Sequence, residues 1–259
     1  MKSVFWIARR EIGSFFYSPI FYVVTTVFLI LYSLLFFAIL SDFSQASLQA
    51  APQAAALQKA GYSINANELV IVPSLGNMGV ILLFIIPLIT MRSFAEERKN
   101  KTFALLLSSP VHLSEIVAGK FLACLAVVTL MILLSSYSIA FIMLTGQPEL
   151  GPILSGYLGI ILMTGCYIAM GVFASSLTDN QIVAAVIGFG LALLMWLLEL
   201  PAQNADTGIG TILEYLSLRS HLESFLKGIL DSSDIAYYLS FMAFILFITH
   251  QVLDSRRWR

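Results

Sequence analysis

Residues 152–176 read PILSGYLGIILMTGCYIAMGVFASS, and no side chain in this stretch is charged. A helix that crosses a lipid bilayer needs about 20 mostly apolar residues, so the stretch predicts a transmembrane helix. Pro152 suits the first position of such a helix. Small residues recur along the stretch, and they allow close packing in lipid, where packing drives helix association. These small residues are Gly156, Gly159, Gly165, Ala169, Gly171 and Ala174.

Composition places the whole chain in the same class. Apolar residues make up 59% of it and charged residues 11%, with a mean hydropathy of +0.89, whereas a soluble domain carries about 25% charged residues. The net charge of −1 argues against nucleic acid as a partner. We therefore predict one all-α, polytopic membrane domain over residues 1–259 with six transmembrane helices. The other five predicted spans are roughly 19–40, 69–90, 115–144, 181–200 and 235–253.

Basic residues predict how the chain is oriented. An even number of spans puts both termini on one side of the membrane, and 11 of the 14 lysines and arginines fall on that side. Because cytoplasmic loops carry an excess of Lys and Arg, both termini are predicted to be cytoplasmic, in a bacterial inner membrane. Lys120 and Glu199 lie near span ends, and we interpret them as side chains that reach the membrane interface.

Residues 1–17 predict an amphipathic helix and not a signal peptide. Lys2, Arg9, Arg10 and Glu11 interrupt the apolar run that a cleavable signal needs. Apolar residues at helical spacing share one face, which favours a helix lying in the cytoplasmic interface over a solvated tail. The residues of this face are Val4, Phe5, Ala8, Ile12, Phe15 and Phe16.

Two segments are predicted on the outer side. Residues 41–68 are rich in alanine and glutamine, which is typical of a short helix or a mobile loop. Residues 201–234 predict helices at, or dipping into, the outer leaflet, and these form either a gate over a central path or a passive anchor. The candidate gate residues are Leu222, Glu223, Phe225 and Leu226.

The inner loop 91–110 combines a charged start with an apolar cluster and ends in Ser108-Ser109-Pro110. This pattern is typical of a short cytoplasmic helix presented to a partner. A solvated, basic inner loop explains the residues equally well.

Several stretches of the chain carry recognisable motifs: FAEERKNKTFALLLSSPV (94–111), EIVAGKF (115–121), GPILSGYLG (151–159), GVFASSLTDNQIVAA (171–185) and the tail (223–241 and 252–259). These motifs resemble those of ABC-2 type permease subunits. The family usually has glycine before the threonine of an EE-x-x-x-G-T motif, whereas here Lys101 precedes Thr102. Without that glycine, the helix is expected to be more continuous. The motifs look most like the branch that includes gliding-motility permeases and the permease of nitrous-oxide-reductase copper-site maturation.

The resemblance implies an interfacial N-terminal helix, six spans, a coupling helix after the second span and outer re-entrant helices before the sixth. It also implies two permease copies, identical or different, paired with two cytoplasmic ATPase subunits that bind ATP and magnesium. Membrane lipid and a periplasmic or auxiliary component are further expected partners. The chain itself has no G-x-x-x-x-G-K-[ST] phosphate loop, so we predict no enzyme activity, cofactor or metal for it.

On this basis, a helix around 93–107 is predicted to carry the movement of the ATPase to the spans. Its two glutamates bind basic residues of the ATPase or cap the loop, and its apolar residues fill a groove of the ATPase. The turn 176–181 is a second, smaller contact. The predicted interface residues are Glu96, Glu97, Arg98, Thr102, Phe103, Leu105, Leu106, Asp179 and Asn180.

Two other functions fit a polytopic membrane protein less well. A stand-alone channel or ion-coupled secondary carrier would not explain the inner helix. An intramembrane enzyme needs polar catalytic groups at membrane depth, whereas His112, His221 and His250 lie at membrane edges on different segments. No residue pattern selects a cargo or decides between export and the transmission of force.

Overall fold

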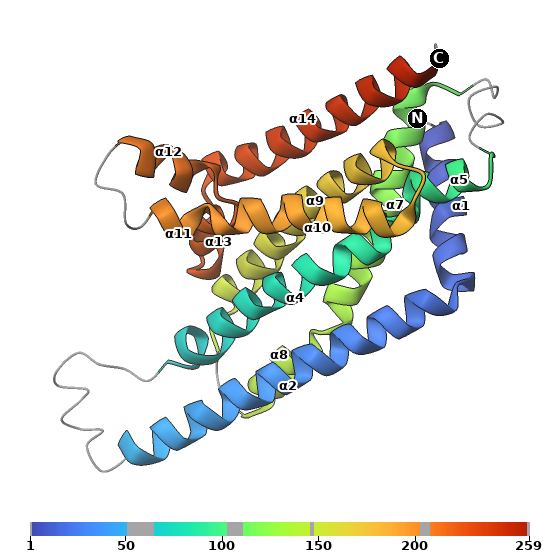
Figure 1. Cartoon of the computed structure of the whole chain (residues 1–259). Coiled ribbons are helices and arrows are strands. Elements are labelled where there is room, and N and C mark those ends of the chain that lie inside the picture. Colours follow the sequence, from blue (N-terminus) through green and yellow to red (C-terminus); the bar gives the residue numbers. More distant parts are fainter. Residues whose placement is uncertain (1, 51–64, 103–110, 146–147, 203–207, 258–259) are drawn as a thin grey trace.

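The helices form an elongated bundle with shorter helices at its two ends (Figure 1). A computed structural model describes residues 2–50, 65–102, 111–145, 148–202 and 208–257. Within these ranges the chain forms helices and no strand. The helices are α1 (Lys2–Tyr17), α2 (Pro19–Ala50), the π-helical turn η2 (Asn67–Ile71), α4 (Val72–Thr90), α5 (Arg92–Lys99), α7 (Leu113–Leu134), α8 (Tyr137–Thr145), α9 (Leu150–Leu177), α10 (Gln181–Leu197), α11 (Glu199–Ala202), α12 (Gly208–Leu216), α13 (Leu218–Leu226) and α14 (Ser232–Arg257).

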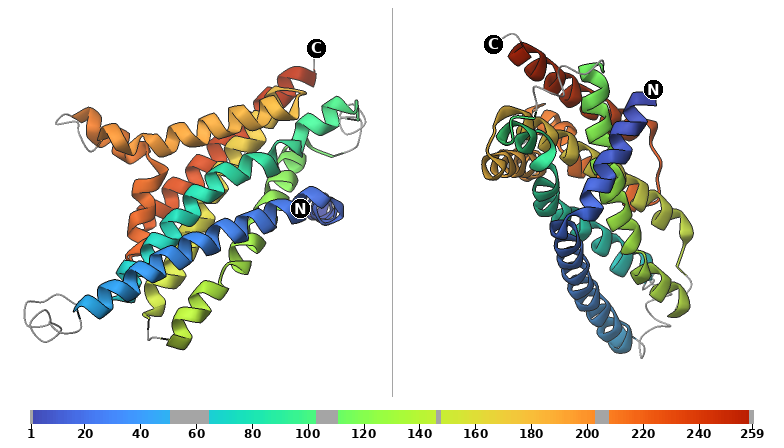
Figure 2. Two further views of the ribbon diagram at one scale, coloured as in Figure 1. Left: turned by 60° about the horizontal axis from the view of Figure 1, so that its bottom comes forward. Right: turned by 90° about the vertical axis from the view of Figure 1, so that its right-hand side faces the viewer.

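The two ends of the bundle carry different helices. Helices α1 and α5 gather with the last turns of α14 at one end, called here the terminus end (Figures 1 and 2). The opposite end, called here the far end, carries α11, α12 and α13. Both chain termini therefore lie at the same end, in agreement with an even number of crossings.

Five helical segments among the described residues are long and apolar enough to cross a membrane. They are Pro19–Gln49, Asn67–Lys99, Leu113–Leu144, Leu150–Leu177 and Ser232–Ser255. The sixth predicted span, 181–200, is divided. It consists of the 17-residue apolar helix α10, a break at Leu198 and the short helix α11. A membrane-spanning helix needs about 17–25 residues, so α10 alone lies at the lower limit.

The predicted span 115–144 is also divided, into α7 and α8. Ser135 lies in the break, and its hydroxyl donates to the carbonyl oxygen of Ile132 at 2.6 Å. Such bonds offer the backbone an alternative to the helical pattern, which explains the break. The two prolines of the second span lie in the first turn of α4 (Pro73) and one turn before its end (Pro87).

Helix α9 is the central element of the bundle and packs against α4, α7, α10, α13 and α14. Its glycines let two of these neighbours approach closely. A Cβ atom at Gly159 would lie 2.6 Å from Cβ of Phe225 on α13, and one at Gly171 would overlap Oγ1 of Thr90 on α4. The predicted use of small residues for helix packing is confirmed at these two positions.

Helix α1 lies across α7 at the terminus end (Figure 1). Ile12 and Phe15 pack against the core, whereas Phe5 and Phe16 are exposed. The predicted helix is confirmed, and one part of its apolar face packs against the bundle while another part stays exposed. Its location in the cytoplasmic interface stays a prediction. Trp6 is also exposed beside Phe5, so α1 presents a second, aromatic surface away from the bundle.

At the far end, aromatic and acidic side chains join α12, α13 and α14. The His221 Nδ1 atom lies 2.7 Å from Oδ1 of Asp234, and its Nε2 atom lies 2.9 Å from the carbonyl oxygen of Tyr215. The imidazole ring stacks on Tyr237 at a centroid distance of 3.9 Å. These contacts fix α13 against the start of α14.

Candidate functional site

Helix α5 is held against α9 by one serine. The Ser175 Oγ atom accepts hydrogen bonds from the backbone N–H groups of Phe94 (2.9 Å) and Ala95 (3.0 Å), and it donates to the carbonyl oxygen of Met91 (2.9 Å). The first N–H groups of a helix have no partner within the helix, and Met91 has no side chain that can cap them. Ser175 supplies this cap from another helix, so α5 is fixed relative to the central element.

A buried ion cluster joins α5 to α1 and α7. The Lys120 Nζ atom lies 3.0 Å from Oε1 of Glu11 and 2.8 Å from Oε1 of Glu97. The three side chains are 3%, 18% and 15% exposed, respectively. We call Glu11, Glu97 and Lys120 the buried triad. It connects residues of three helices, and α7 is one of the long spans.

The expectation that Lys120 reaches the membrane interface is wrong. Its ammonium group is enclosed by the two carboxylates and lies 5.3 Å from the ring centroid of Phe94. A charge that is removed from water must be compensated by the protein, and the triad does so at short distance. For Glu199 the partner is Arg219, with Nε 3.2 Å from Oε2.

The triad leaves one acceptor unused. The Glu97 Oε2 atom is buried and has no hydrogen-bond partner among the described residues. A cavity of about 30 Å³ next to the triad has Glu11, Arg92 and Lys120 among its lining residues, whereas Glu97 is not part of the lining. This volume exceeds the ~10–15 Å³ that one water molecule needs.

Arg92, the first residue of α5, connects the helix to the corner between α1 and α2. Its Nη1 atom donates to Oγ of Ser18 at 2.7 Å, and its Nε atom donates to Oε2 of Glu96 at 2.8 Å. Ser18 separates the two N-terminal helices, so α5 is joined to the corner after α1 through Arg92 and to α1 itself through the buried triad.

Helix α5 ends earlier than predicted. It stops at Lys99, and Lys101 adopts a positive φ of 57°. The Thr102 N–H group then donates to the carbonyl oxygen of Glu97 at 2.9 Å, which closes the helix end. The expectation of a more continuous helix is wrong, because lysine takes the left-handed conformation at the position where the related motif has glycine.

The predicted second contact lies beside α5. The Arg98 Nη1 atom is 3.5 Å from Oδ1 of Asp179, whose side chain is 71% exposed. Asn180 caps α10, since its Oδ1 atom accepts from the N–H group of Ile182 at 2.9 Å. The turn between α9 and α10 and the helix α5 thus form one continuous surface at the terminus end.

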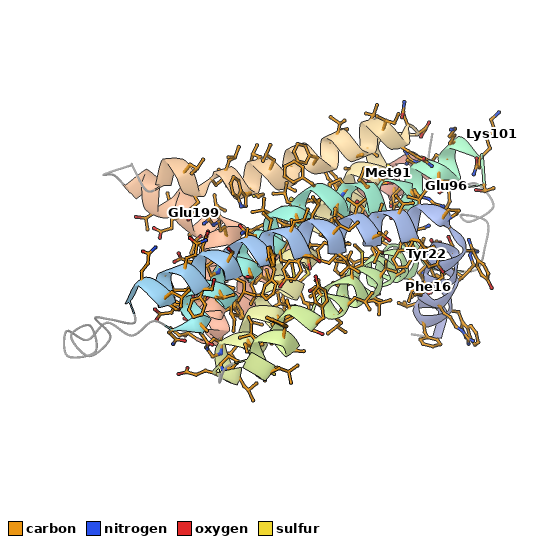
Figure 3. All side chains as sticks on the ribbon, turned by 90° about the horizontal axis from the view of Figure 1, so that it is seen from below. Phe16, Tyr22, Met91, Glu96, Lys101 and Glu199 are labelled. Carbon is orange, nitrogen blue, oxygen red and sulfur yellow. The ribbon has the colours of Figure 1, made fainter. Side chains whose placement is uncertain are left out.

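The predicted interface residues occupy different positions in the structure. Glu96 lies at the terminus end, near Lys101 (Figure 3). Glu97 points into the protein, toward Lys120. Phe103, Leu105 and Leu106 lie outside the described residues, so their role stays a prediction.

Sequence reasoning missed Glu11, Lys120 and Ser175 as parts of this site. A signal existed for the first two. Glu11 is spaced four residues from both Ile7 and Phe15, on the side of α1 that packs against the bundle. Lys120 interrupts a span in which the only other charged residue is Glu115, at its start. A charge on a buried face implies a buried partner, whereas nothing in the sequence marks Ser175.

The predicted gate residues lie on α13. Leu222, Phe225 and Leu226 are buried, with Phe225 against Gly159 of α9. Glu223 is exposed and forms an ion pair with Lys227, with 3.5 Å between Oε2 and Nζ. Three of the four residues therefore pack into the bundle, and their role as a gate stays a prediction.

Comparison with known proteins adds one finding. A family model described as "ABC-2 family transporter protein" matches residues 5–252. No curated protein matches the chain. The family match covers nearly every helix of the bundle, including α5, the triad and α13. The chain therefore belongs to the ABC-2 transporter family, whose members are membrane components of ABC transporters.

Proposed function

We propose that this chain is the permease subunit of an ABC transporter and that α5 receives the movement of a separate cytoplasmic ATPase subunit. The buried triad is the observation that carries this proposal. It joins α5 to α1 and to the long span α7 through bonds of 2.8–3.0 Å. An exposed helix end fixed to a span in this way is suited to transmit a displacement.

The docking surface in this proposal consists of the exposed part of α5 and the turn between α9 and α10. Asp179 is 71% exposed and Glu96 is 36% exposed, so both are accessible to basic groups of a partner. Glu97 acts inside the protein, as the link to Lys120. Two permease subunits, identical or different, bind two ATPase subunits, and ATP and magnesium are bound by the ATPase.

The experiment separates docking from transmission. The chain is purified with its ATPase subunit, and both binding and stimulated ATP hydrolysis are measured. Glu96→Ala combined with Asp179→Ala is expected to weaken binding about tenfold, because two charge-assisted contacts are lost. Lys120→Met combined with Glu11→Gln and Glu97→Gln removes the charges of the buried triad together, so that none stays buried without a partner. This variant is expected to leave binding within about twofold but to reduce stimulation, since the surface remains while its link to α7 is lost.

Lys227→Met is the matched control, because it removes a lysine from an ion pair at the far end. It is expected to change neither quantity. Normal binding and stimulation in all three variants would overturn the proposal. Failure of the chain to bind any ABC ATPase would favour the stand-alone channel or carrier.

We further propose that the terminus end faces the cytoplasm of a bacterial inner membrane. The 11 basic residues on that side support this orientation. Both native cysteines, Cys124 and Cys166, are buried, so a thiol reagent is expected to label only cysteines that are introduced at exposed positions. In intact cells, a membrane-impermeant maleimide is expected to label Ile229→Cys and to spare Tyr17→Cys. The reverse labelling pattern would contradict this orientation.

The motif at 94–111 supports placement near the gliding-motility and nitrous-oxide-reductase-maturation branch. In that reading, the chain transmits force or exports cargo, with a periplasmic or auxiliary component as a further partner. Co-purification of a soluble extracytoplasmic protein with the chain tests this part of the proposal. Absence of any such protein from a complex that retains the ATPase would contradict it.

A further inference from the structure

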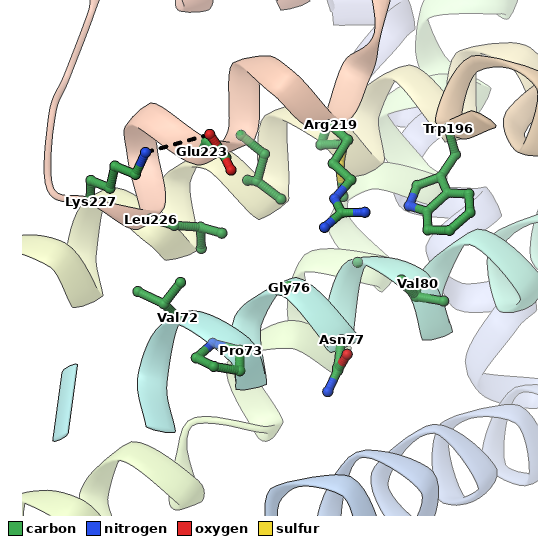
Figure 4. A pocket seen from close by; sticks show the side chains of 13 residues that line it. Val72, Pro73, Gly76, Asn77, Val80, Trp196, Arg219, Glu223, Leu226 and Lys227 are labelled. Carbon is green, nitrogen blue, oxygen red and sulfur yellow. Dashed lines mark hydrogen bonds and ion pairs between the residues drawn. The ribbon is translucent and has the colours of Figure 1, made fainter. Parts of the chain in front are cut away.

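A cavity of about 390 Å³ opens at the far end between α4, α9, α10 and α13 (Figure 4). Its volume is within the range of about 300–1,000 Å³ that is typical of small-molecule sites. Apolar side chains form much of its wall, among them Val80, Trp196, Leu222 and Leu226. The cavity also contains polar groups, and these decide what it can bind.

Arg219 is the main polar group of the cavity, and it projects from α13 toward α4 (Figure 4). Its guanidinium lies 5.7 Å from the ring centroid of Trp196 and forms an ion pair with Glu199. The Nε atom faces Glu199 in this ion pair, and the two Nη groups carry the other four N–H donors of the guanidinium. These donors are available to a ligand, because the side chain is 49% exposed.

Asn77 adds a second unused polar group from another wall. It lies within the long span of α4, lines the cavity and makes no hydrogen bond to the described residues. Polar groups at membrane depth are costly and are retained where they contact a ligand or a partner. The remaining charges of the lining, Glu223 and Lys227, form an ion pair with each other. Arg219 is thus the cation of the lining whose carboxylate partner, Glu199, lies outside the lining.

We propose that this cavity binds an anionic amphiphile from the adjacent lipid leaflet. The phosphate or carboxylate group binds the Arg219 guanidinium, which matches the geometry of such planar or branched anions with paired N–H donors. Asn77 donates to the same headgroup, and the apolar chain lies along Trp196 and Val80. This binding needs no ATPase, so it is tested on the isolated chain, independently of the proposed function.

The test measures lipid binding to the purified full-length chain by native mass spectrometry in a non-ionic detergent. The probes are phosphatidylglycerol, zwitterionic phosphatidylcholine and inorganic phosphate. The wild-type chain is expected to bind phosphatidylglycerol about tenfold more tightly than phosphatidylcholine, as one charge-assisted contact predicts. Arg219→Gln is expected to abolish this difference, and Asn77→Leu to reduce it severalfold.

Arg9→Gln is the matched control, because Arg9 also lies over a tryptophan, 5.5 Å from the Trp6 ring centroid, but far from the cavity. It is expected to bind as the wild type does. Arg219→Lys keeps the charge without the paired donors, and it provides the test if Arg219→Gln does not fold. Equal selectivity in the wild type and both Arg219 variants would overturn the proposal. Displacement of phosphatidylglycerol by an equal concentration of inorganic phosphate would also overturn it, because the site would then recognise a free anion.

Discussion

Lys120 at the terminus end and Arg219 at the far end are two cations set among the helices, and their surroundings differ. Lys120 is 3% exposed and has two carboxylates within 3.0 Å, whereas Arg219 is 49% exposed and has one carboxylate partner at 3.2 Å. A buried charge depends on its partners, while a half-exposed charge keeps much of its hydration. Lys120 therefore belongs to a buried cluster that holds helices together, whereas Arg219 belongs to a cavity that is open to a ligand.

The largest expected effect is the loss of stability in Lys120→Met. Removing one partner of a buried ion pair costs about 3–5 kcal/mol, and here two carboxylates lose their counter-ion. Arg219→Met is expected to cost less than about 1 kcal/mol, since its ion pair is half exposed. Unfolding of both variants in the same detergent measures the difference.

A compensated variant distinguishes lost charge pairing from lost packing. Lys120→Met combined with Glu11→Gln and Glu97→Gln is expected to recover most of the lost stability, because no uncompensated charge remains. Equal destabilisation by Lys120→Met and Arg219→Met would show that the two ends do not differ in the way described.

Close helix packing is expected to give the next largest effect, at both ends. Gly171→Ala and Gly159→Ala each force a Cβ atom into a neighbour, Thr90 at the terminus end and Phe225 at the far end. Overpacking of this kind costs about 1–3 kcal/mol. Gly190→Ala is the control, because nothing lies within 4 Å of its added Cβ atom. If thermal unfolding shows that Gly190→Ala destabilises the chain as much as the other two variants do, the described packing of α9 is contradicted.

The third effect concerns two serines of α9, one at each end. Ser175 makes three hydrogen bonds to the start of α5, and Ser155 makes one to α13, to the carbonyl oxygen of Phe225 at 2.7 Å. Ser175→Ala is expected to cost about 1–2 kcal/mol, as the loss of a helix cap does. Ser155→Ala is expected to cost about 0.5–1.5 kcal/mol, as the loss of one hydrogen bond does.

Hydrogen exchange of the Phe94 and Ala95 amides measures the local part of this prediction. Both amides are expected to exchange faster in Ser175→Ala than in the wild type. Ser176→Ala is the control, since the Ser176 hydroxyl bonds to Phe173 within its own helix. Unchanged exchange in Ser175→Ala would contradict the assigned cap.

The smallest effect is expected at two helix ends, each of which is followed by a residue in the left-handed conformation. Lys101 follows α5 with a φ of 57°, and Gly228 follows α13 with a φ of 85°. Lys101→Gly is expected to stabilise the chain by about 1 kcal/mol, because glycine adopts this conformation without steric cost. Gly228→Ala is expected to destabilise it by a similar amount. The unfolding midpoint is expected to rise in Lys101→Gly and to fall in Gly228→Ala relative to the wild type. Shifts in the same direction would contradict the prediction.

Much of the fold follows from composition and periodicity. Long charge-free runs predict the helices of the bundle, and small residues such as Gly159 and Gly171 predict where they approach one another. The cap of α14 was also predictable, since Oδ1 of Asp231 accepts from the Ser233 N–H group. This bond holds the pKa of the Asp231 carboxyl group below its usual value.

The breaks within the helices were harder to predict. The division of one span at Ser135 depends on a local hydrogen bond that competes with the helical pattern, and hydropathy does not report such bonds. The end of α5 at Lys99 depends on a lysine in a conformation that sequence statistics assign to glycine. In both cases a local backbone preference overrides the periodic signal.

The candidate site was predicted in its location but not in its construction. Charge density marked the loop that contains Glu96 and Glu97, yet the partner of Glu97 is 23 residues away and that of Lys120 on α1 is 109 residues away. Pairings over such distances follow from tertiary packing, which periodicity along one helix does not encode. The cavity beside Arg219 is formed by four separate helices, so the sequence pattern does not mark this residue as part of a site.

The buried triad also has a consequence for the evolution of this family. Its three charges come from separate parts of the gene, and each depends on the other two. A relative that carries a neutral residue at the position of Lys120 should therefore carry neutral residues at those of Glu11 and Glu97 as well. Substitutions at these three positions are expected to occur together, as linked changes across otherwise diverged sequences.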